Sequence, residues 1–228
     1  MSKSPHVGTL REKPLHASLK RWYSQPGDGV EVPVDGFVID LVRDELLIEI
    51  QTRGFSGMKR KLRKLLDLGH TVRIVHPIAA EKVIVKLDET GAEISRRRSP
   101  KRGAPADVFG ELVSFPAWIN ESGLEIEIVL THEEEIRVHE PGKAWRRKGW
   151  VVVERRLVGV VDGAAIAGED DLRKFLPDEL PAQFTTAELA TAIGRPRRIA
   201  QQMAYCLREA GVIAAVGKRA NAYLYEVS

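Results

Sequence analysis

Residues 36–52 have the sequence GFVIDLVRDELLIEIQT, in which two apolar runs are joined by the polar pair Asp44 and Glu45. The apolar runs predict two β-strands, and the polar pair predicts a tight turn between them. If the turn centres on this pair, Asp40 lies opposite Glu49, with their Cβ atoms roughly 5 Å apart. The segment therefore predicts a β-hairpin that carries one carboxylate on each strand.

The two faces of this hairpin differ in chemistry. Gln51 points the same way as Glu49, because side chains alternate along a strand. Burying two carboxylates on an apolar hairpin is costly unless positive charge lies between them, and a divalent cation with oxygen ligands is the simplest source of that charge. A salt bridge of the acids with Arg53 or Lys59 is the alternative. The other face is filled by Ile39, Leu41, Ile48 and Ile50.

The segments around the hairpin predict an α/β fold. A helix is expected within residues 9–23 and a strand at 30–34, before the hairpin. After it, we expect a helix from Ser56, as N-cap, to about Leu68, ended by Gly69, and a short strand at 71–75 that Pro77 closes. This order of helix, three strands, helix and strand predicts an open sheet between helices.

The hairpin resembles the PD-(D/E)XK nuclease superfamily, whose fold is restriction-endonuclease-like with an α-β-β-β-α-β core. Val38-Ile39-Asp40-Leu41 and Ile48-Glu49-Ile50-Gln51 carry the resemblance, which extends from about Leu10 to Pro77. It implies a Mg²⁺-dependent nuclease, with Mn²⁺ able to substitute. By position it makes Asp40 and Glu49 metal ligands, with the Ile50 carbonyl beside them and Glu12 of the first helix as a further candidate.

The chain departs from the superfamily at Gln51, where a lysine is usual. Glutamine can position a water molecule or reach the metal, but it cannot supply positive charge to the transition state. Some members of the superfamily with glutamine there are active. Lys59 or Lys61 of the following helix could supply the charge instead, by helical geometry.

A second acid competes with Asp40 for the role of metal ligand. Asp35, in Pro33-Val34-Asp35, lies closer to the proline-acid pattern of the superfamily. We prefer Asp40, because the register of the hairpin places it across from Glu49.

The middle of the chain predicts a β/α extension of the core. Residues 82–87 and 92–96 read as a hairpin, 107–119 as a helix broken at Pro116, and 124–138 as a strand. Residues 145–161, basic and aromatic and then apolar, are expected to link two lobes. The basic segment from Arg96 to Arg102 predicts phosphate contacts through Arg97, Arg98 and Lys101.

From Asp162 onward the chain resembles winged-helix domains. A helix at 187–193 capped by Thr186, a helix at 197–210, and strands at 212–216 and 223–227 follow in the winged-helix order. The second helix would read base edges and the tip between the strands would contact phosphates. The expected DNA contacts are Arg195, Arg197, Arg198, Gln201, Gln202, Lys218 and Arg219.

Composition limits the class of protein. The 228 residues, 43% of them apolar, suffice for one large or two modest domains, and the formal charge of +3 is weak evidence for a polyanionic partner. One cysteine, Cys206, excludes an internal disulfide. With no apolar run long enough to span a membrane and no signal peptide, a cytoplasmic location and no membrane partner are expected.

Together these patterns predict a nuclease-like domain at residues 1–161 and a winged-helix domain at 162–228. We expect a Mg²⁺-dependent endodeoxyribonuclease that docks on duplex DNA, and a homodimer is compatible with this interpretation. The alternative is a DNA-binding protein or regulator that has lost catalysis through Gln51. A third interpretation is a protein-interaction scaffold that touches no nucleic acid.

Overall fold

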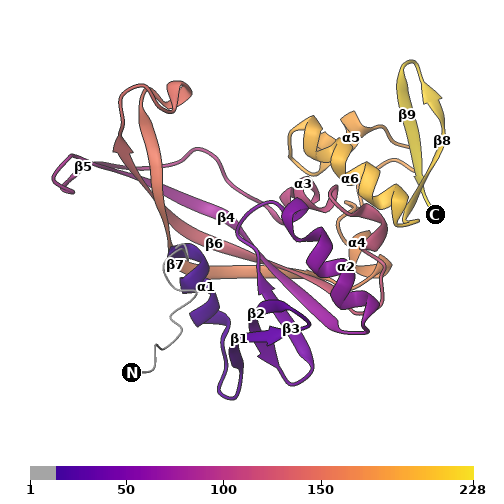
Figure 1. Ribbon diagram of the computed structural model, residues 1–228. Helices are drawn as coiled ribbons and strands as arrows, with labels where there is room; N and C mark the ends of the chain where they lie inside the picture. Colours follow the sequence, from indigo (N-terminus) through magenta and orange to yellow (C-terminus); the bar gives the residue numbers. More distant parts are fainter. Residues whose placement is uncertain (1–13) are drawn as a thin grey trace. The chain divides into compact units, whose positions relative to one another are not determined.

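The computed structural model describes residues 14–228 and shows a mixed α/β protein with a large mixed sheet (Figure 1). Its seven strands lie in the order β1-β2-β3-β4-β6-β7, with β5 paired to β4, and β8 and β9 form a separate ribbon. The strands are β1 (Gly29–Val34), β2 (Phe37–Arg43), β3 (Leu46–Ile50), β4 (Thr71–Leu87), β5 (Glu93–Arg98), β6 (Leu124–His139), β7 (Trp150–Ile166), β8 (Ile213–Arg219) and β9 (Ala222–Val227).

The helices are short and precede or follow these strands. The α-helices are α1 (Pro14–Tyr23), α2 (Lys59–Asp67), α3 (Phe109–Leu112), α4 (Glu169–Arg173), α5 (Thr186–Ala192) and α6 (Arg197–Glu209). Single 3₁₀ turns are η2 (Phe55–Met58), η3 (Pro105–Val108), η4 (Pro116–Trp118) and η5 (Trp145–Arg147). The α/β class expected from the sequence is therefore confirmed.

The chain forms two compact units that do not follow sequence order. Unit 1 contains residues 14–26, 79–103 and 130–162, and unit 2 contains residues 27–78, 104–129 and 163–228. Strands β4, β6 and β7 each contribute to both units. The division expected between residues 161 and 162 stays a prediction.

The hairpin of residues 36–52 forms as expected in unit 2. Strands β2 and β3 are antiparallel, with Leu41 opposite Ile48 and Arg43 opposite Leu46, so the predicted register is confirmed. Strand β1 is antiparallel to β2, whereas β3 is parallel to β4. The predicted apolar face is buried, because Ile39, Leu41, Ile48 and Ile50 are each at most 2% exposed.

The apolar side of helix α2 is buried, and the helix ends where the sequence indicates. Leu62 and Leu65 are fully buried, while the cations between them face outward. Gly69, with φ of +85°, donates its N–H to the carbonyl of Leu66 at 2.9 Å and so ends the helix. The prediction that Ser56 caps this helix is wrong, because the turn η2 comes first and Met58 is the N-cap.

Strand β4 corrects another prediction, because Pro77 does not close it. Its pairing with β3 ends at Val75 and its pairing with β5 begins at Val83. Pro77 falls between these two ladders, where its missing N–H breaks neither of them. The strand therefore continues to Leu87.

The segment 145–161 was expected to link two lobes, and in the structure it is part of the sheet, so its role between lobes stays a prediction. Its first residues form the turn η5 at the end of the β6–β7 hairpin, and the rest belongs to β7. The valines and the tryptophan of 150–161 are β-branched or aromatic residues, which favour a strand.

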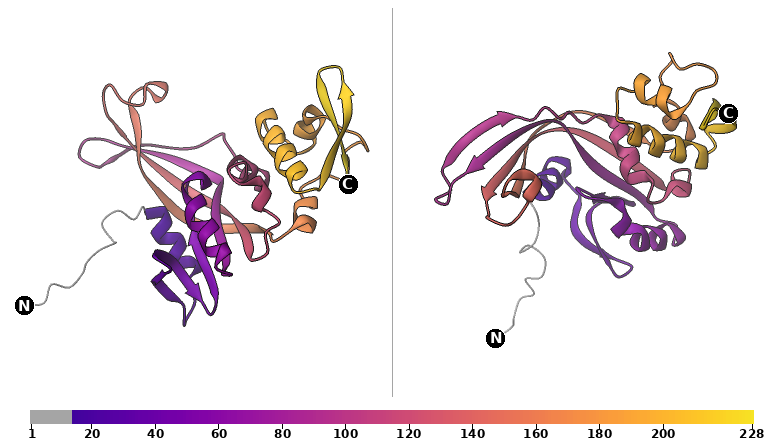
Figure 2. Two further views of the ribbon diagram at one scale, coloured as in Figure 1. Left: turned by 45° about the vertical axis from the view of Figure 1, so that its right-hand side comes forward. Right: turned by 90° about the horizontal axis from the view of Figure 1, so that it is seen from above.

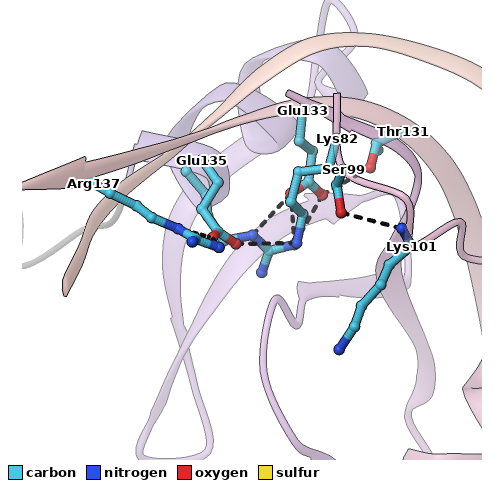
Figure 3. A network of polar contacts seen from close by, with 8 residues as sticks. Lys82, Ser99, Lys101, Thr131, Glu133, Glu135 and Arg137 are labelled. Carbon is cyan, nitrogen blue, oxygen red and sulfur yellow. Dashed lines mark hydrogen bonds and ion pairs between the residues drawn. The ribbon is translucent and has the colours of Figure 1, made fainter. Parts of the chain in front are cut away.

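Unit 1 is stabilised by ion pairs between its long strands (Figure 3). Glu133 on β6 is 1% exposed and accepts hydrogen bonds from the hydroxyl of Thr131 and from Arg155 on β7. Glu135, two residues along the same face, pairs with Lys82 and Arg137. These cations compensate the two buried carboxylates.

The C-terminal part of unit 2 contains α5, α6 and the β8–β9 ribbon. Thr185, not Thr186 as predicted, caps α5. Its hydroxyl accepts a hydrogen bond from the Glu188 N–H, and the Glu188 carboxylate accepts one from the Thr185 N–H at 2.7 Å. Phe184, just before α5, forms an isolated antiparallel bridge with Tyr225 of β9. Met203 and Leu207 of α6 are fully buried beneath these elements.

Candidate active site

The acidic pair, Asp40 and Glu49, lies on adjacent antiparallel strands of unit 2. Both side chains are half-buried, on the face opposite the isoleucines of the hairpin. The backbone N–H of Ile50 donates to Asp40 Oδ2 at 2.9 Å, which fixes the Asp40 carboxylate against β3. The two acids are therefore held on one face by the hairpin itself.

Lys61 of α2 supplies the positive charge beside this pair. Its Nζ donates to Glu49 Oε1 at 2.5 Å and to the carbonyl of Val38 at 2.6 Å. Of the two lysines proposed from the sequence, Lys61 reaches the acids, whereas Lys59 is exposed. The alternative considered from the sequence, a salt bridge of the acids with Arg53 or Lys59, is not what forms, because Lys61 pairs with Glu49 instead.

The surroundings of Glu49 shift the pKa of its carboxyl group. Burial raises the pKa of Glu49 above its ordinary value of 4.5, and the Asp40 carboxylate raises that pKa further. The Lys61 ammonium lowers the pKa of Glu49 but does not fully offset the burial. A raised pKa of this kind is common where a carboxylate is held for a cationic ligand or for proton transfer.

Gln51 extends the site at the end of β3. Its side-chain Nε2 donates to the carbonyl of Gly54 at 2.8 Å. Its backbone carbonyl would accept the N–H of residue 77 in the parallel ladder, but Pro77 has none, and His76 Nδ1 donates there instead at 2.6 Å. His76, which is 8% exposed and meets the ring of Phe55 edge-on, therefore positions the strand end.

Sequence reasoning found no partners for His76. The signal that could have identified it is the proline that follows, since a proline in a ladder leaves a neighbouring carbonyl in need of another donor.

The competing ligand Asp35 is engaged elsewhere. It lies in the turn between β1 and β2, where its carboxylate contacts His70 Nε2 at 2.6 Å and its carbonyl accepts from Lys64 at 2.8 Å. The structure thus places Asp40, and not Asp35, beside Glu49. Glu12, the further candidate ligand, lies outside the described residues.

The donor set at the acidic pair is of the kind that Mg²⁺ prefers. Two carboxylates from Asp40 and Glu49, with the carbonyl of Ile50 at the same strand end, are hard oxygen donors. Mg²⁺ is commonly held by only one or two carboxylates and completes its octahedron with water and substrate phosphate oxygens. Within residues 14–228 no three His, Cys, Asp or Glu side chains are close enough to bind one metal ion together. A Mg²⁺ ion at this site would therefore be held by the two carboxylates and by water or phosphate oxygens.

The DNA contacts expected on α6 divide into two groups. Arg197, Arg198 and Gln201 are exposed. Arg195, by contrast, forms a two-point ion pair with Asp107 of η3, and the side-chain oxygen of Gln202 is buried without a hydrogen-bond partner. The first group is available to an external ligand. In the second group, the Arg195–Asp107 pair joins the start of α6 to η3, and the Gln202 oxygen is enclosed among the residues that the structure describes.

The tip of the β8–β9 ribbon carries the two other cations expected to contact DNA. Lys218 lies 5.0 Å from the ring centroid of Tyr223, and Arg219 pairs with Glu188 at 2.7 Å. Tyr223 is 54% exposed. Tyr205, on α6, is also exposed and has Arg208 over its ring. The ribbon and α6 each present exposed cations beside an exposed tyrosine.

The cations expected on β5 and the following loop are exposed and belong to unit 1. Arg98 pairs with Glu81 at 3.1 Å although its side chain is 75% exposed, and Arg97 contacts the carbonyl of Arg98. Lys101 is exposed. The structure does not assign these residues to the unit that holds the acidic pair.

Comparison with known proteins identifies the family but no activity. The chain is a mixed α/β protein with an acidic pair on its sheet, and it belongs to the family described as a domain of unknown function (DUF8091), whose model matches residues 13–167. An uncharacterized protein of Treponema pallidum (strain Nichols) is 32% identical over 221 residues, covering 96% of this chain and 86% of that relative. No solved structure matches significantly. Among residues 14–228, no helix has both the length and the apolar composition needed to cross a membrane.

Proposed function

We propose that this protein is a Mg²⁺-dependent endodeoxyribonuclease with a restriction-endonuclease-like core. The observation that carries the proposal is the acidic pair on adjacent strands with the Lys61 ammonium 2.5 Å from Glu49. The order α1, β1, β2, β3, α2, β4, in which β3 is parallel to β4, supports the core, because it is the order that the sequence resemblance implies.

Each residue of the site has a role in this proposal. Asp40, Glu49 and the Ile50 carbonyl would hold Mg²⁺, which lowers the pKa of bound water and stabilises the charge that develops on a phosphodiester. Lys61 replaces the lysine that the superfamily usually has at position 51, and places its ammonium where the extra phosphate charge accumulates. Gln51, fixed through Gly54, orients a water molecule.

We also propose that the C-terminal segment is a winged-helix domain that docks on duplex DNA. The order α4, bridge at Phe184, α5, α6 and β8–β9 supports this fold. The exposed Arg197, Arg198 and Gln201 would then read base edges and phosphates from α6, with Lys218 on the ribbon.

The direct test is incubation of the purified chain with supercoiled plasmid and Mg²⁺ or Mn²⁺. We expect nicked and linear products that require the metal and disappear when EDTA is added. Binding of duplex DNA without cleavage in either metal would support the second candidate, a nuclease-fold regulator, which the glutamine at position 51 favours. Cleavage that persists in EDTA would contradict the metal site.

Two arginines of the α6 region are expected to behave differently when replaced. Arg198→Ala should weaken duplex binding and lower the slope of log K against log[salt] by about one, because it removes one exposed phosphate contact. Arg195→Ala should instead lower the free energy of unfolding, by about 1–3 kcal/mol, because Asp107 loses its partner. Fluorescence anisotropy at several salt concentrations and a thermal melt separate the two effects.

If Arg195→Ala reduced the salt slope while Arg198→Ala did not, the assignment of the exposed face of α6 would be wrong. Glu209→Ala, on the last turn of the same helix, is a matched control that should leave both quantities nearly unchanged.

A further inference from the structure

The free end of the β6–β7 hairpin in unit 1 presents an exposed tryptophan. This segment, residues 140–149, is called the hairpin tip below and appears as the short helical turn at the end of the salmon-coloured hairpin in Figure 2. Trp145 is 79% exposed, more than any other large hydrophobic residue of 14–228. A tryptophan normally buries a large apolar area, so such exposure calls for a ligand.

The hairpin tip has a defined backbone. Glu140 donates its N–H to the carbonyl of Gly149 at 2.8 Å, and Lys148 donates to the carbonyl of Trp145 at 3.0 Å. Ala144 and Lys148 adopt the left-handed conformation, with φ of +47° and +51°, which is unfavourable for residues other than glycine. The turn η5 is thus flanked on both sides by a residue in the left-handed conformation.

The base of the tip is formed by a glycine and two rings. Gly149 has φ of +84°, a conformation that favours glycine, and a Cβ there would lie 2.5 Å from Nε2 of the exposed His139 ring, which would have to move. The ring of His139 in turn meets that of Trp150, with centroids 5.3 Å apart. The base of the tip therefore has a ring contact and a glycine turn of its own.

The charge of the hairpin tip is strongly positive. Its four cations, against the single carboxylate of Glu140, give it a formal charge as positive as that of the whole chain. Lys143 pairs with that carboxylate at 2.5 Å, and the guanidinium of Arg146 lies 5.0 Å from the Trp145 ring centroid. The four cations are Lys143, Arg146, Arg147 and Lys148.

We propose that the hairpin tip binds nucleic acid, with Trp145 stacked on an unpaired base and the surrounding cations on the phosphates. An aromatic ring beside arginine and lysine is how proteins bind single strands without reading sequence. An anionic membrane would also attract the cations, but the tip offers one apolar ring between Ala144 and Arg146, too little area to insert stably. The inference rests on the proposed function in taking nucleic acid as the ligand.

The test measures binding of fluorescein-labelled oligonucleotides by the full chain in EDTA, where no metal-dependent cleavage can interfere. Trp145→Ala should weaken binding to a single strand and to a forked duplex by about tenfold or more, and binding to a blunt duplex less. Trp145→Phe should retain most of the affinity, because a phenyl ring still stacks. Trp22→Ala is the matched control, since Trp22 is also in unit 1 and 51% exposed.

Three outcomes would overturn the proposal, and they show whether the proposed function fails with it. Equal single-strand affinities for wild type and Trp145→Ala, with plasmid cleavage intact, would remove the role of the tip alone. Loss of binding to phosphatidylserine vesicles in Trp145→Ala, with DNA affinity unchanged, would assign the tip to membranes. Absence of any DNA binding by the wild type would remove the proposed function as well.

Discussion

Asp40→Ala and Glu49→Ala are each expected to lower the rate of metal-dependent plasmid cleavage by about a thousandfold or more. Each removes one of the two carboxylates that face each other across β2 and β3, and the remaining acid would hold the metal more weakly and in a less defined position. The metal contributes several kcal/mol of transition-state stabilisation, and each 1.36 kcal/mol corresponds to a factor of ten in rate. Single-turnover cleavage at saturating Mg²⁺ measures the loss.

Two variants in the same hairpins serve as controls. Glu45→Ala removes an exposed acid from the turn between the strands, and Asp35→Ala removes the acid that contacts His70. Both should retain cleavage near the wild-type rate. A loss with Asp35→Ala that matched the loss with Asp40→Ala would return the ligand role to Asp35 and sink the present assignment.

If the proposed site cleaves DNA, the rate of cleavage should depend on pH. Because the pKa of Glu49 is raised by burial, its carboxylate becomes protonated as the pH falls through that raised value, and metal binding is lost there. Lys61→Ala removes the charge that lowers the pKa of Glu49, so the acid limb of the pH–rate profile should move to higher pH. Lys59→Ala should leave the profile unchanged, since Lys59 is exposed.

The stability of the metal-free protein should change with pH in the direction opposite to the cleavage rate. A carboxyl group with a folded-state pKa above its unfolded value binds protons more tightly when folded. The free energy of unfolding therefore rises, as far as Glu49 is concerned, as the pH falls from the raised pKa towards 4.5. The burial of Glu49 thus lowers the stability of the metal-free protein at pH values above the raised pKa.

The hairpin could be predicted from the sequence, because its register depends only on the position of the turn and on the alternation of side chains along each strand. The polar pair Asp44–Glu45 defined the turn, and the two-residue period then placed Asp40 across from Glu49. The choice between Lys59 and Lys61 could not be made in the same way. The facing side of a helix depends on where the helix begins, and the turn η2 moved that start past Ser56.

Other features depended on tertiary context that no local pattern contains. Pro77 is compatible with a long strand only because β3 stops pairing before it and β5 starts after it. The exposed Arg195 expected from the sequence is engaged with Asp107, which lies 88 residues earlier in the chain. A pairing over such a separation cannot be read from periodicity.

Among substitutions of the buried charged residues of unit 1, Glu133→Ala is expected to cause the largest decrease in the free energy of unfolding. The Glu133 side chain is 0% exposed, and Arg155 donates two hydrogen bonds of 2.8 Å to it. Breaking a buried ion pair costs about 3–5 kcal/mol, and because Arg155 is 31% exposed and regains water, we expect about 2–4 kcal/mol. For a chain of this size that corresponds to a fall in Tm of roughly 5–15 °C in a thermal melt.

A matched surface pair separates burial from charge as the cause. Glu154 and Arg156 form an ion pair of 2.7 Å on β7, with the arginine 52% exposed, and Glu154→Ala should cost less than about 1 kcal/mol. The double variant Glu133→Leu with Arg155→Leu should recover most of the lost stability, because it leaves neither charge unpaired. Equal losses for Glu133→Ala and Glu154→Ala would show that the buried pair adds nothing to unit 1 beyond surface electrostatics, and the cations around Glu133 would then need another explanation.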